Sequence, residues 1–113
     1  MNPDKVVIEL NMLRHRLSDE IERLKEKGDK YAKSRCNYKK NFAIKTALLK
    51  SGGASAAGAE QEANGQLADM KGTYELDKIL WETTNMVVRA KIAECNVLQS
   101  VLKGLSGEWN QSV

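Results

Sequence analysis

Mostly apolar residues recur every seven positions along this chain, in two series that mirror each other. The first series contains Leu10, Leu17, Leu24, Tyr31, Tyr38 and Lys45, and the second contains Leu67, Tyr74, Trp81, Val88, Cys95 and Leu102. Paired members such as Leu10 and Leu102 lie equally far from position 56, inside the glycine- and serine-rich segment 51–58. A sustained heptad repeat is typical of coiled-coil helices, and small flexible residues suit a reversal of the chain. The pattern therefore predicts an all-α fold, a long, coiled-coil-like antiparallel two-helix hairpin.

Start and stop signals set the expected limits of these helices. Asn2 can cap the first helix, and Pro3 suits its first position because proline lacks the backbone donor. Glycines interrupt the second helix, so its continuity between 65 and 72 is left open. The expected elements are a helix over about 3–50, a turn over about 51–58, a second helix over about 59–104 and a loose tail over 105–113. The whole chain, 1–113, is predicted to be a single domain.

The other seam positions of the heptad repeat are less apolar. With the two series at position a, the d positions are Leu13, Glu20, Lys27, Ser34, Asn41 and Leu48 in the first helix and Met70, Asp77, Thr84, Lys91, Leu98 and Leu105 in the second. Both sets are apolar at their ends and polar in the middle. We therefore expect a narrow seam of a residues through the hairpin, with the alternative that the layers shift by half a heptad and set a against d.

The second helix carries more apolar residues than one neighbouring helix can cover. Those outside the seam that we assign to an oligomer interface are Leu76, Ile79, Leu80, Met86, Val87, Val97 and Val101. Exposed contiguous apolar surface on a protein in water usually marks an interface. We therefore expect a homo-oligomer, either a four-helix-bundle dimer or a larger helical assembly, with the second helix inside.

Few side chains in this sequence are suited to catalysis or metal binding. His15 is the single histidine and lies between two arginines, a setting typical of a solvated helix surface. Neither a Glu-x-x-His nor a Cys-x-x-Cys spacing occurs, which removes the usual ligand sets of dimetal and zinc sites. The glycines of the turn follow a helix instead of a strand, unlike a phosphate-binding loop. We predict a protein that is not an enzyme and has no catalytic residue, metal site or cofactor.

The expected location is the cytoplasm, without contact with a membrane. The first residues lack the basic start and apolar core of a secretion signal, and no apolar stretch approaches the roughly 18 residues of a membrane span. In the mirrored register, Cys36 and Cys95 would lie roughly 28 Å apart along the hairpin at about 1.5 Å per residue. We therefore expect both thiols to be free, as in a reducing compartment.

Positive charge is concentrated in one segment of the first helix. Residues 25–50 carry nine basic and two acidic groups, although the net charge of the whole chain is only +3. The candidate nucleic-acid-binding residues, which we call the basic block, are Lys30, Lys33, Arg35, Lys39, Lys40, Lys45 and Lys50. No acid lies between the first and the last of them. Such a block can follow a phosphate backbone through charge alone, with a steep dependence on salt.

The same cations have a second interpretation, a solvated face that is partly neutralised within the hairpin. In the mirrored register the block faces residues 62–82, whose acids are Glu62, Asp69, Glu75, Asp77 and Glu82. The aromatic residues do not favour nucleic acid, because they fall on the seam and are expected to pack on one another. These residues are Tyr31, Tyr38, Tyr74 and Trp81.

Several stretches of the chain together carry a resemblance to known proteins. They are Tyr31-Ala32-Lys33-Ser34-Arg35-Cys36-Asn37-Tyr38-Lys39-Lys40, the stretch to Leu48-Leu49-Lys50, Tyr74-Glu75-Leu76, and Ala90-Lys91-Ile92-Ala93-Glu94-Cys95-Asn96-Val97-Leu98-Gln99. In this pattern the chain resembles a group of small bacteriophage helical-hairpin proteins. That group belongs to early phage regions, often beside recombination and single-strand-binding functions, and mostly has no assigned activity. The resemblance implies an accessory role in DNA recombination or replication in the cytoplasm of a bacterial host cell, and it supplies no site residues.

Two functional hypotheses follow, because a helical hairpin serves proteins of many functions. In the first, a non-enzymatic oligomeric protein assists DNA metabolism and contacts phosphates through the basic block. In the second, the chain is a protein-interaction module, an inhibitor or adaptor of a host or phage protein, and does not bind DNA. A purely structural oligomer is the remaining alternative.

Overall fold

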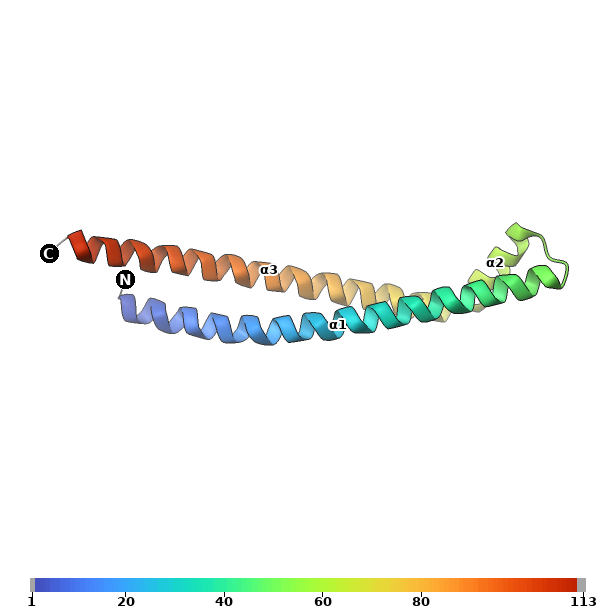
Figure 1. Ribbon diagram of the computed structural model, residues 1–113, viewed down its shortest axis with the longest axis horizontal. Helices are drawn as coiled ribbons and strands as arrows, with labels where there is room; N and C mark the ends of the chain where they lie inside the picture. The colour runs from blue at the N-terminus through green and yellow to red at the C-terminus, as the bar shows by residue number, and fades with distance from the viewer. Residues whose placement is uncertain (1, 112–113) are drawn as a thin grey trace. The chain divides into compact units, whose positions relative to one another are not determined.

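The computed structural model describes residues 2–111, and the side chains of residues 2–105. The described chain forms helices α1 (Pro3–Ser51), α2 (Ala56–Gln66) and α3 (Ala68–Gln111), and it contains no strand (Figure 1). The all-α prediction is confirmed, whereas the single-domain organisation of the whole chain stays a prediction. The chain divides into two compact units, described separately below: a terminal unit of Met1–Lys25 with Thr83–Val113, and a turn unit of Glu26–Glu82.

Helix α1 begins with the cap that the sequence predicts. The Asn2 side-chain oxygen Oδ1 accepts a hydrogen bond from the Asp4 N–H at 2.9 Å, and the Asn2 carbonyl accepts one from the Val6 N–H at 3.3 Å. Pro3 occupies the first helical position, where its missing donor leaves no bond unmade. The negative charge of Asp4 in the first turn also complements the positive end of the helix dipole.

Residues 52–55 connect α1 to α2, so the predicted turn over 51–58 was too long. The reason is a cap that starts α2 at once. The Ser55 hydroxyl oxygen accepts a hydrogen bond from the Gly58 N–H at 3.1 Å, and this satisfies one of the unpaired donors of the first helical turn. The segment that looked flexible in the sequence is therefore helical from Ala56.

A Schellman motif ends α1. The Ala54 N–H donates to the Leu49 carbonyl and the Gly53 N–H donates to the Lys50 carbonyl, both at 3.0 Å. Gly53 has a φ of 99°, in the left-handed region that glycine adopts without a steric penalty. These bonds satisfy the last carbonyls of α1, so the chain reverses without a longer loop.

The second predicted helix, over 59–104, is two helices. The break is at Leu67, inside the window 65–72 that the sequence left open. Leu67 has φ −103° and ψ 17°, yet its N–H donates to the Ala63 carbonyl at 2.9 Å. Its own carbonyl accepts from the Lys71 N–H at 3.0 Å. Hydrogen bonding thus continues on both sides of the break, which is confined to one residue.

Helix α3 continues to Gln111, so the predicted helix end at Gly104 and the loose tail over 105–113 are wrong for residues 105–111. Residues 112–113 lie outside the described residues. A glycine typically ends a helix by taking the left-handed conformation, and among the described residues only Gly53 has a positive φ. Gly104 costs about 1 kcal/mol in a helix, less than the several hydrogen bonds that continuation retains.

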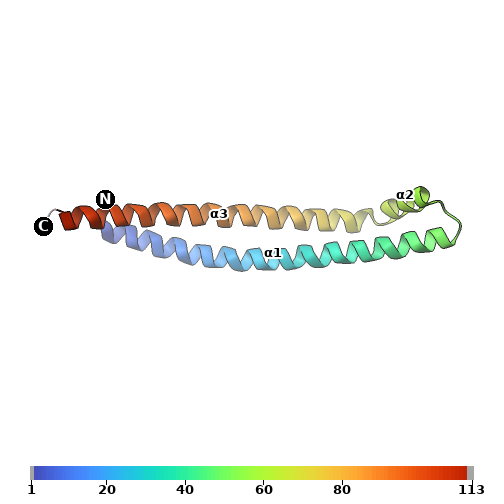
Figure 2. The same cartoon turned by 45° about the horizontal axis from the view of Figure 1, so that its top comes forward.

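Aromatic residues form the centre of the turn unit. The Tyr31 and Trp81 rings stack with centroids 5.6 Å apart, and the Tyr38 and Tyr74 rings lie 5.1 Å apart. Both pairs lie equally far from position 56, which confirms the mirrored register in this unit and sets position a against a. Tyr38 is buried, and its hydroxyl donates to the Asn64 Oδ1 at 3.1 Å, so α2 is tied to α1 (Figure 2).

Aliphatic and small residues form the core of the terminal unit, in which α1 and α3 run side by side in opposite directions (Figures 1 and 2). Its buried side chains are Val6, Leu10, Val88 and Cys95. The mirrored pair Leu10 and Leu102 line the same surface depression. The heptad series therefore faces inward in this unit too.

Polar d residues also face inward, so the predicted narrow seam of a residues was wrong. From Leu67 to Leu105 every a and d residue is buried or half-buried. In α1 the same holds from Val6 onward except for Leu48, which is 63% exposed. The alkyl parts of long polar side chains such as Lys27 can line a seam while their charged ends reach water. Polar d residues therefore interrupt the apolar character of the seam without ending it.

Candidate nucleic-acid interface

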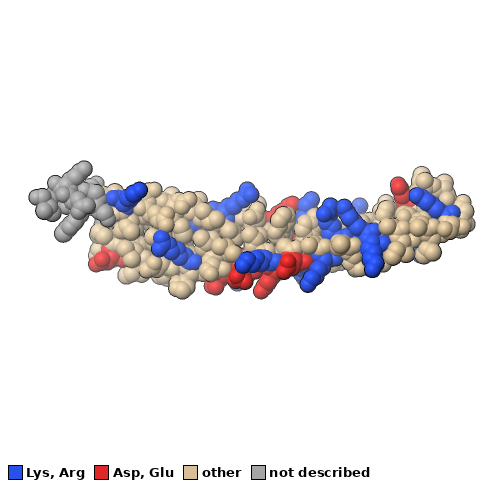
Figure 3. Space-filling view, in the orientation of Figure 1, with Lys and Arg blue, Asp and Glu red and all other residues tan. Residues whose placement is uncertain are grey.

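The basic block lies on α1 within the turn unit. Lys45, at heptad position a, is half-buried, and the other members are exposed. On the face that Figure 3 shows, basic side chains gather where α1 and α3 overlap in the view, with acidic side chains beside them. The exposed members are Lys30, Lys33, Arg35, Lys39, Lys40 and Lys50. Most of the predicted nucleic-acid-binding residues are therefore accessible to a phosphate backbone.

Little of this charge is neutralised by acids of the turn unit. Among the described residues, one ion pair within 4.0 Å includes a block residue: the Lys30 Nζ lies 3.8 Å from the Asp77 Oδ1. A second ion pair of the unit joins Lys78 to Glu82 within α3 at 4.0 Å. Both separations are too long for a good hydrogen bond. The interpretation of the block as a partly paired face is supported at Lys30 alone.

Three of the acids that were expected to face the block lie outside the seam of α3. Asp69, Glu75 and Glu82 occupy heptad positions b and c, away from the seam, and all are exposed. Asp77, at position d, is the acid of this helix segment that turns inward. Because the helix period separates b and c from a and d, these acids lie outside the seam and not between the two helices.

Asp77 is a buried acid in the aromatic seam. It is 4% exposed, and its Oδ2 has no hydrogen-bond partner among the described residues. In the mirrored register Ser34 is the d residue nearest to its layer, but the Ser34 hydroxyl donates to the Tyr31 carbonyl at 3.2 Å. A buried carboxylate with an unpaired oxygen is costly, so the packing of the adjacent aromatic pairs must offset it.

A surface groove of about 400 Å³ opens beside the basic block. Its lining residues are Gly28, Tyr31, Ala32, Arg35, Cys36, Lys39 and Trp81. Gly28 makes room for the indole, because a Cβ there would lie 3.3 Å from the Trp81 Nε1 and 3.4 Å from its Cδ1. Sequence reasoning missed this groove, since it assigned Tyr31 and Trp81 to the seam alone. A glycine one turn before a seam aromatic was the signal that could have indicated it.

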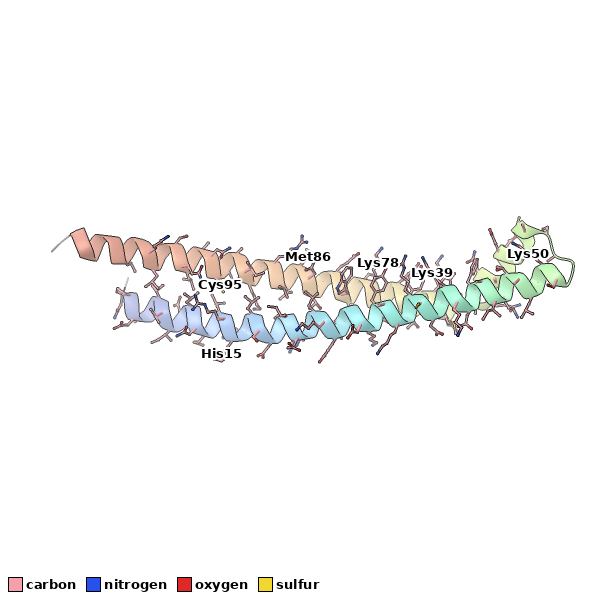
Figure 4. All side chains as sticks on the ribbon, in the orientation of Figure 1. His15, Lys39, Lys50, Lys78, Met86 and Cys95 are labelled. Carbon is pink, nitrogen blue, oxygen red and sulfur yellow. The ribbon has the colours of Figure 1, made fainter. Side chains whose placement is uncertain are left out.

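The described side chains form no cluster suited to binding a metal ion. Within the described residues there is no group of three or more His, Cys, Asp and Glu side chains that could hold a metal ion. His15 is exposed in the terminal unit, beside a shallow hollow that Arg14 also lines (Figure 4). Cys36 is exposed and Cys95 is buried, and both thiols are free, as predicted.

The predicted oligomer-interface residues are all exposed, from 36% for Leu80 and Val101 to 70% for Met86. Those in the turn unit are Leu76, Ile79 and Leu80, and those in the terminal unit are Met86, Val87, Val97 and Val101. In the terminal unit Cys95 lies between α3 and α1, whereas Met86 lies on the side of α3 away from α1 (Figure 4). One helix therefore leaves these side chains uncovered.

An apolar stripe follows the exposed side of α3 in the terminal unit. Its residues are Met86, Ala90, Ala93 and Val97, all exposed. They recur at alternating spacings of four and three residues, the same spacing as the buried seam. Helix α3 thus carries two heptad stripes in this unit, and α1 covers one of them.

Comparisons with models of protein families, with curated proteins and with solved structures find no match for this chain. In the part of the chain that the structure describes, no helix has both the length and the apolar character needed to cross a membrane. Three surfaces of the chain itself bear on its function: the basic block, the groove beside it and the apolar stripe of α3.

Proposed function

We propose that this protein is a non-enzymatic DNA-binding accessory protein that contacts phosphates through the basic block. The supporting observation is that six block cations are exposed and that, among the described residues, only Lys30 has an acid within 4.0 Å. A cation that is already paired gains little from a phosphate. An unpaired, exposed cation can replace the counterions of DNA, and their release favours binding.

The length and distribution of the block suit a phosphate backbone. From Lys30 to Lys50 it extends for about 30 Å at ~1.5 Å per residue, which matches about nine base pairs at ~3.4 Å each. Its members lie on several sides of α1, so they do not form one row directed at base edges. Binding should therefore depend little on DNA sequence and strongly on salt concentration.

The distribution of charge in the turn unit favours an approach of DNA from α1. Asp69, Glu75 and Glu82 lie on the outer side of α3, where they would repel phosphates. The exposed cations of the basic block on α1 attract phosphates instead. DNA is therefore expected to approach the turn unit from α1.

Self-association and a phage origin are further parts of this proposal. The apolar stripe of the terminal unit supports a homo-oligomer, since Met86 is 70% and Val97 is 62% exposed. The resemblance to phage helical-hairpin proteins supports a role in DNA recombination or replication in the cytoplasm of a bacterial host. An oligomer would bring several basic blocks to one DNA molecule and raise the overall affinity through effective concentration.

Fluorescence anisotropy of a labelled DNA duplex, titrated at several salt concentrations, tests the proposal. The test variant combines Lys33→Glu, Arg35→Glu, Lys39→Glu and Lys40→Glu. Its affinity should fall at least ~100-fold at low salt, because four attractive charges become repulsive. The slope of log K against log salt should fall by about 0.9 for each phosphate that the variant no longer neutralises.

A matched control changes the net charge by the same amount in the terminal unit. It combines Lys5→Glu, Arg14→Glu, Arg16→Glu and Lys103→Glu, all at exposed positions. The affinity of this variant for DNA should fall only slightly, because its substitutions weaken only the long-range attraction to DNA. Salt screens that attraction over about 10 Å at ~0.1 M. Equal losses in the two variants, or a wild-type protein that does not bind DNA at low salt, would contradict the proposal.

A protein-interaction module without DNA binding is the second candidate function. The apolar stripe of α3 favours it, because an exposed heptad stripe also suits a helix of another protein. Affinity capture from host and phage lysates would compare the wild type with a variant that combines Met86→Glu and Val97→Glu. A stoichiometric protein held by the wild type alone, together with no DNA binding, would support this function instead of the first.

A further inference from the structure

The groove beside the basic block combines aromatic and cationic groups in one small volume. Tyr31 and Trp81 both line it, and their rings stack at an interplanar angle of 27°. Both residues are half-buried, so part of each ring remains accessible from the groove. Gly28 leaves the α1 side of the groove open, because it places no side chain beside the Trp81 indole. A flat, partly apolar ligand fits this kind of wall.

Two cations line the same groove. Arg35 and Lys39 lie one helical turn apart on the same side of α1, so both can reach a single phosphate. Both are exposed, and neither has an acid within 4.0 Å among the described residues. Arginine can bond two phosphate oxygens at once, and lysine adds a point charge.

We propose that this groove binds one nucleotide of single-stranded DNA, with the phosphate between Arg35 and Lys39 and the base against the Tyr31–Trp81 pair. The inference rests on the proposed DNA-binding function and narrows its substrate class. A groove of about 400 Å³ is near the lower end of small-ligand sites, so it accommodates one nucleotide and excludes a duplex. Bases in a duplex are stacked and paired, and one would have to leave the stack to enter.

Cys36 provides a direct probe, because it lines the groove and is exposed while Cys95 is buried. Alkylation by neutral iodoacetamide is measured for the protein alone, with a saturating thymidine oligonucleotide and with a saturating duplex of the same length. The single strand should slow modification of Cys36 at least ~5-fold, because a base stacked in the groove covers the thiol. The duplex should have little effect, and Cys95 should stay unmodified throughout.

Two charge variants separate the groove from the rest of the basic block. Arg35→Gln with Lys39→Gln removes the groove cations, and Lys33→Gln with Lys40→Gln removes two exposed block cations outside it. The groove variant should lower the affinity for single strands at least ~10-fold more than the affinity for duplex. The control variant should lower both affinities by the same factor.

A third variant tests the aromatic wall. Tyr31→Leu keeps an apolar residue in the seam but removes the ring, so the affinity for single strands should fall at least ~5-fold without a change for duplex. Circular dichroism checks that the variant remains helical. Equal protection of Cys36 by both forms of DNA and equal effects of the two charge variants would overturn the inference while leaving the proposed DNA binding intact. A wild-type protein that binds neither form would overturn both.

Discussion

The terminal and turn units repeat one heptad pattern with different side chains. In the terminal unit the buried positions hold aliphatic or small residues such as Leu10 and Cys95. In the turn unit the equivalent seam holds stacked aromatic residues and the buried acid Asp77. Aliphatic layers can pack in several registers, whereas large rings and a buried charge tolerate few arrangements. The difference indicates that the turn unit does most to set the register of the pairing.

The outer surfaces of the two units differ as well. The terminal unit exposes an apolar stripe on α3, and the turn unit exposes the basic block on α1. Apolar surface suits the association of helices, and unpaired cations suit phosphates. One seam spacing therefore supports two surfaces with different chemistry, and this division of roles can be tested.

The largest expected effect on stability is at the aromatic seam. Tyr38→Ala should lower the free energy of unfolding by about 3–5 kcal/mol, because it leaves a cavity beside Tyr74 and Phe42. Urea denaturation followed by circular dichroism measures this. Tyr38→Phe is the control and should cost about 1 kcal/mol, since it removes only the hydrogen bond to Asn64. If both variants cost the same small amount, the aromatic seam does not stabilise the turn unit.

Charges on the apolar stripe of the terminal unit should prevent self-association. Met86→Glu with Val97→Glu should weaken it at least ~100-fold, or about 2.7 kcal/mol, because charges cannot enter an apolar interface without a partner. Light scattering over a range of concentrations measures the effect. The matched control, Ile44→Glu with Leu48→Glu, changes exposed apolar residues of α1 in the turn unit and should leave assembly unchanged. Wild-type protein that is monomeric, or equal effects of the two variants, would remove the proposed difference between the units.

Replacing the buried acid of the turn unit should stabilise the protein. Asp77→Leu should raise the free energy of unfolding by about 1–2 kcal/mol, because it removes a buried carboxylate whose Oδ2 has no hydrogen-bond partner among the described residues. Thermal and urea denaturation measure the change, with Asp77→Asn as the control that keeps the polar atoms. A loss of stability in the leucine variant would show that the interaction with Lys30 is net stabilising instead.

Glycine substitutions should give the smallest effects, with opposite signs in the two units. Gly53→Ala in the turn unit should lower the free energy of unfolding by about 1 kcal/mol, because alanine is strained at a φ of 99°. Gly104→Ala in the terminal unit should raise it by about 0.5–1 kcal/mol, since a helical Cβ there would meet nothing within 4 Å. Thermal unfolding compares the two. The same sign for both would contradict the helical backbone assigned to Gly104.

Patterns in the sequence predicted which residues of α1 and α3 pair, and they predicted the N-terminal cap of α1. Mirrored heptads correctly paired Tyr31 with Trp81, since ring stacking requires only that the two helices keep their register. Asn2 was correctly predicted as a cap, because capping depends on neighbouring residues alone. The end of α3 was predicted wrongly. Gly104 ends a helix or remains within it according to its backbone conformation, which its residue type does not decide.

The candidate site also combines features that the sequence predicted with features that it did not. Exposure of most of the basic block follows from its spread around one helix, and the sequence was enough to predict it. The sparse pairing of its charges was not predictable, because ion pairing depends on where the acids lie across the seam. The groove at Gly28 was also missed, since it exists only where the Trp81 indole from α3 meets a missing side chain on α1.

By itself, the sequence determined the all-α class, the mirrored pairing and the concentration of cations on one helix segment. These properties depend on period, composition and neighbouring residues, which a linear chain already contains. Only the tertiary structure decided the inward position of Asp77, the break at Leu67, the sparse neutralisation of the block and the groove between Arg35 and Trp81. Apart from the break at Leu67, which is a matter of local backbone conformation, each of these depends on distances between side chains of different helices, and those distances do not exist until the helices pack.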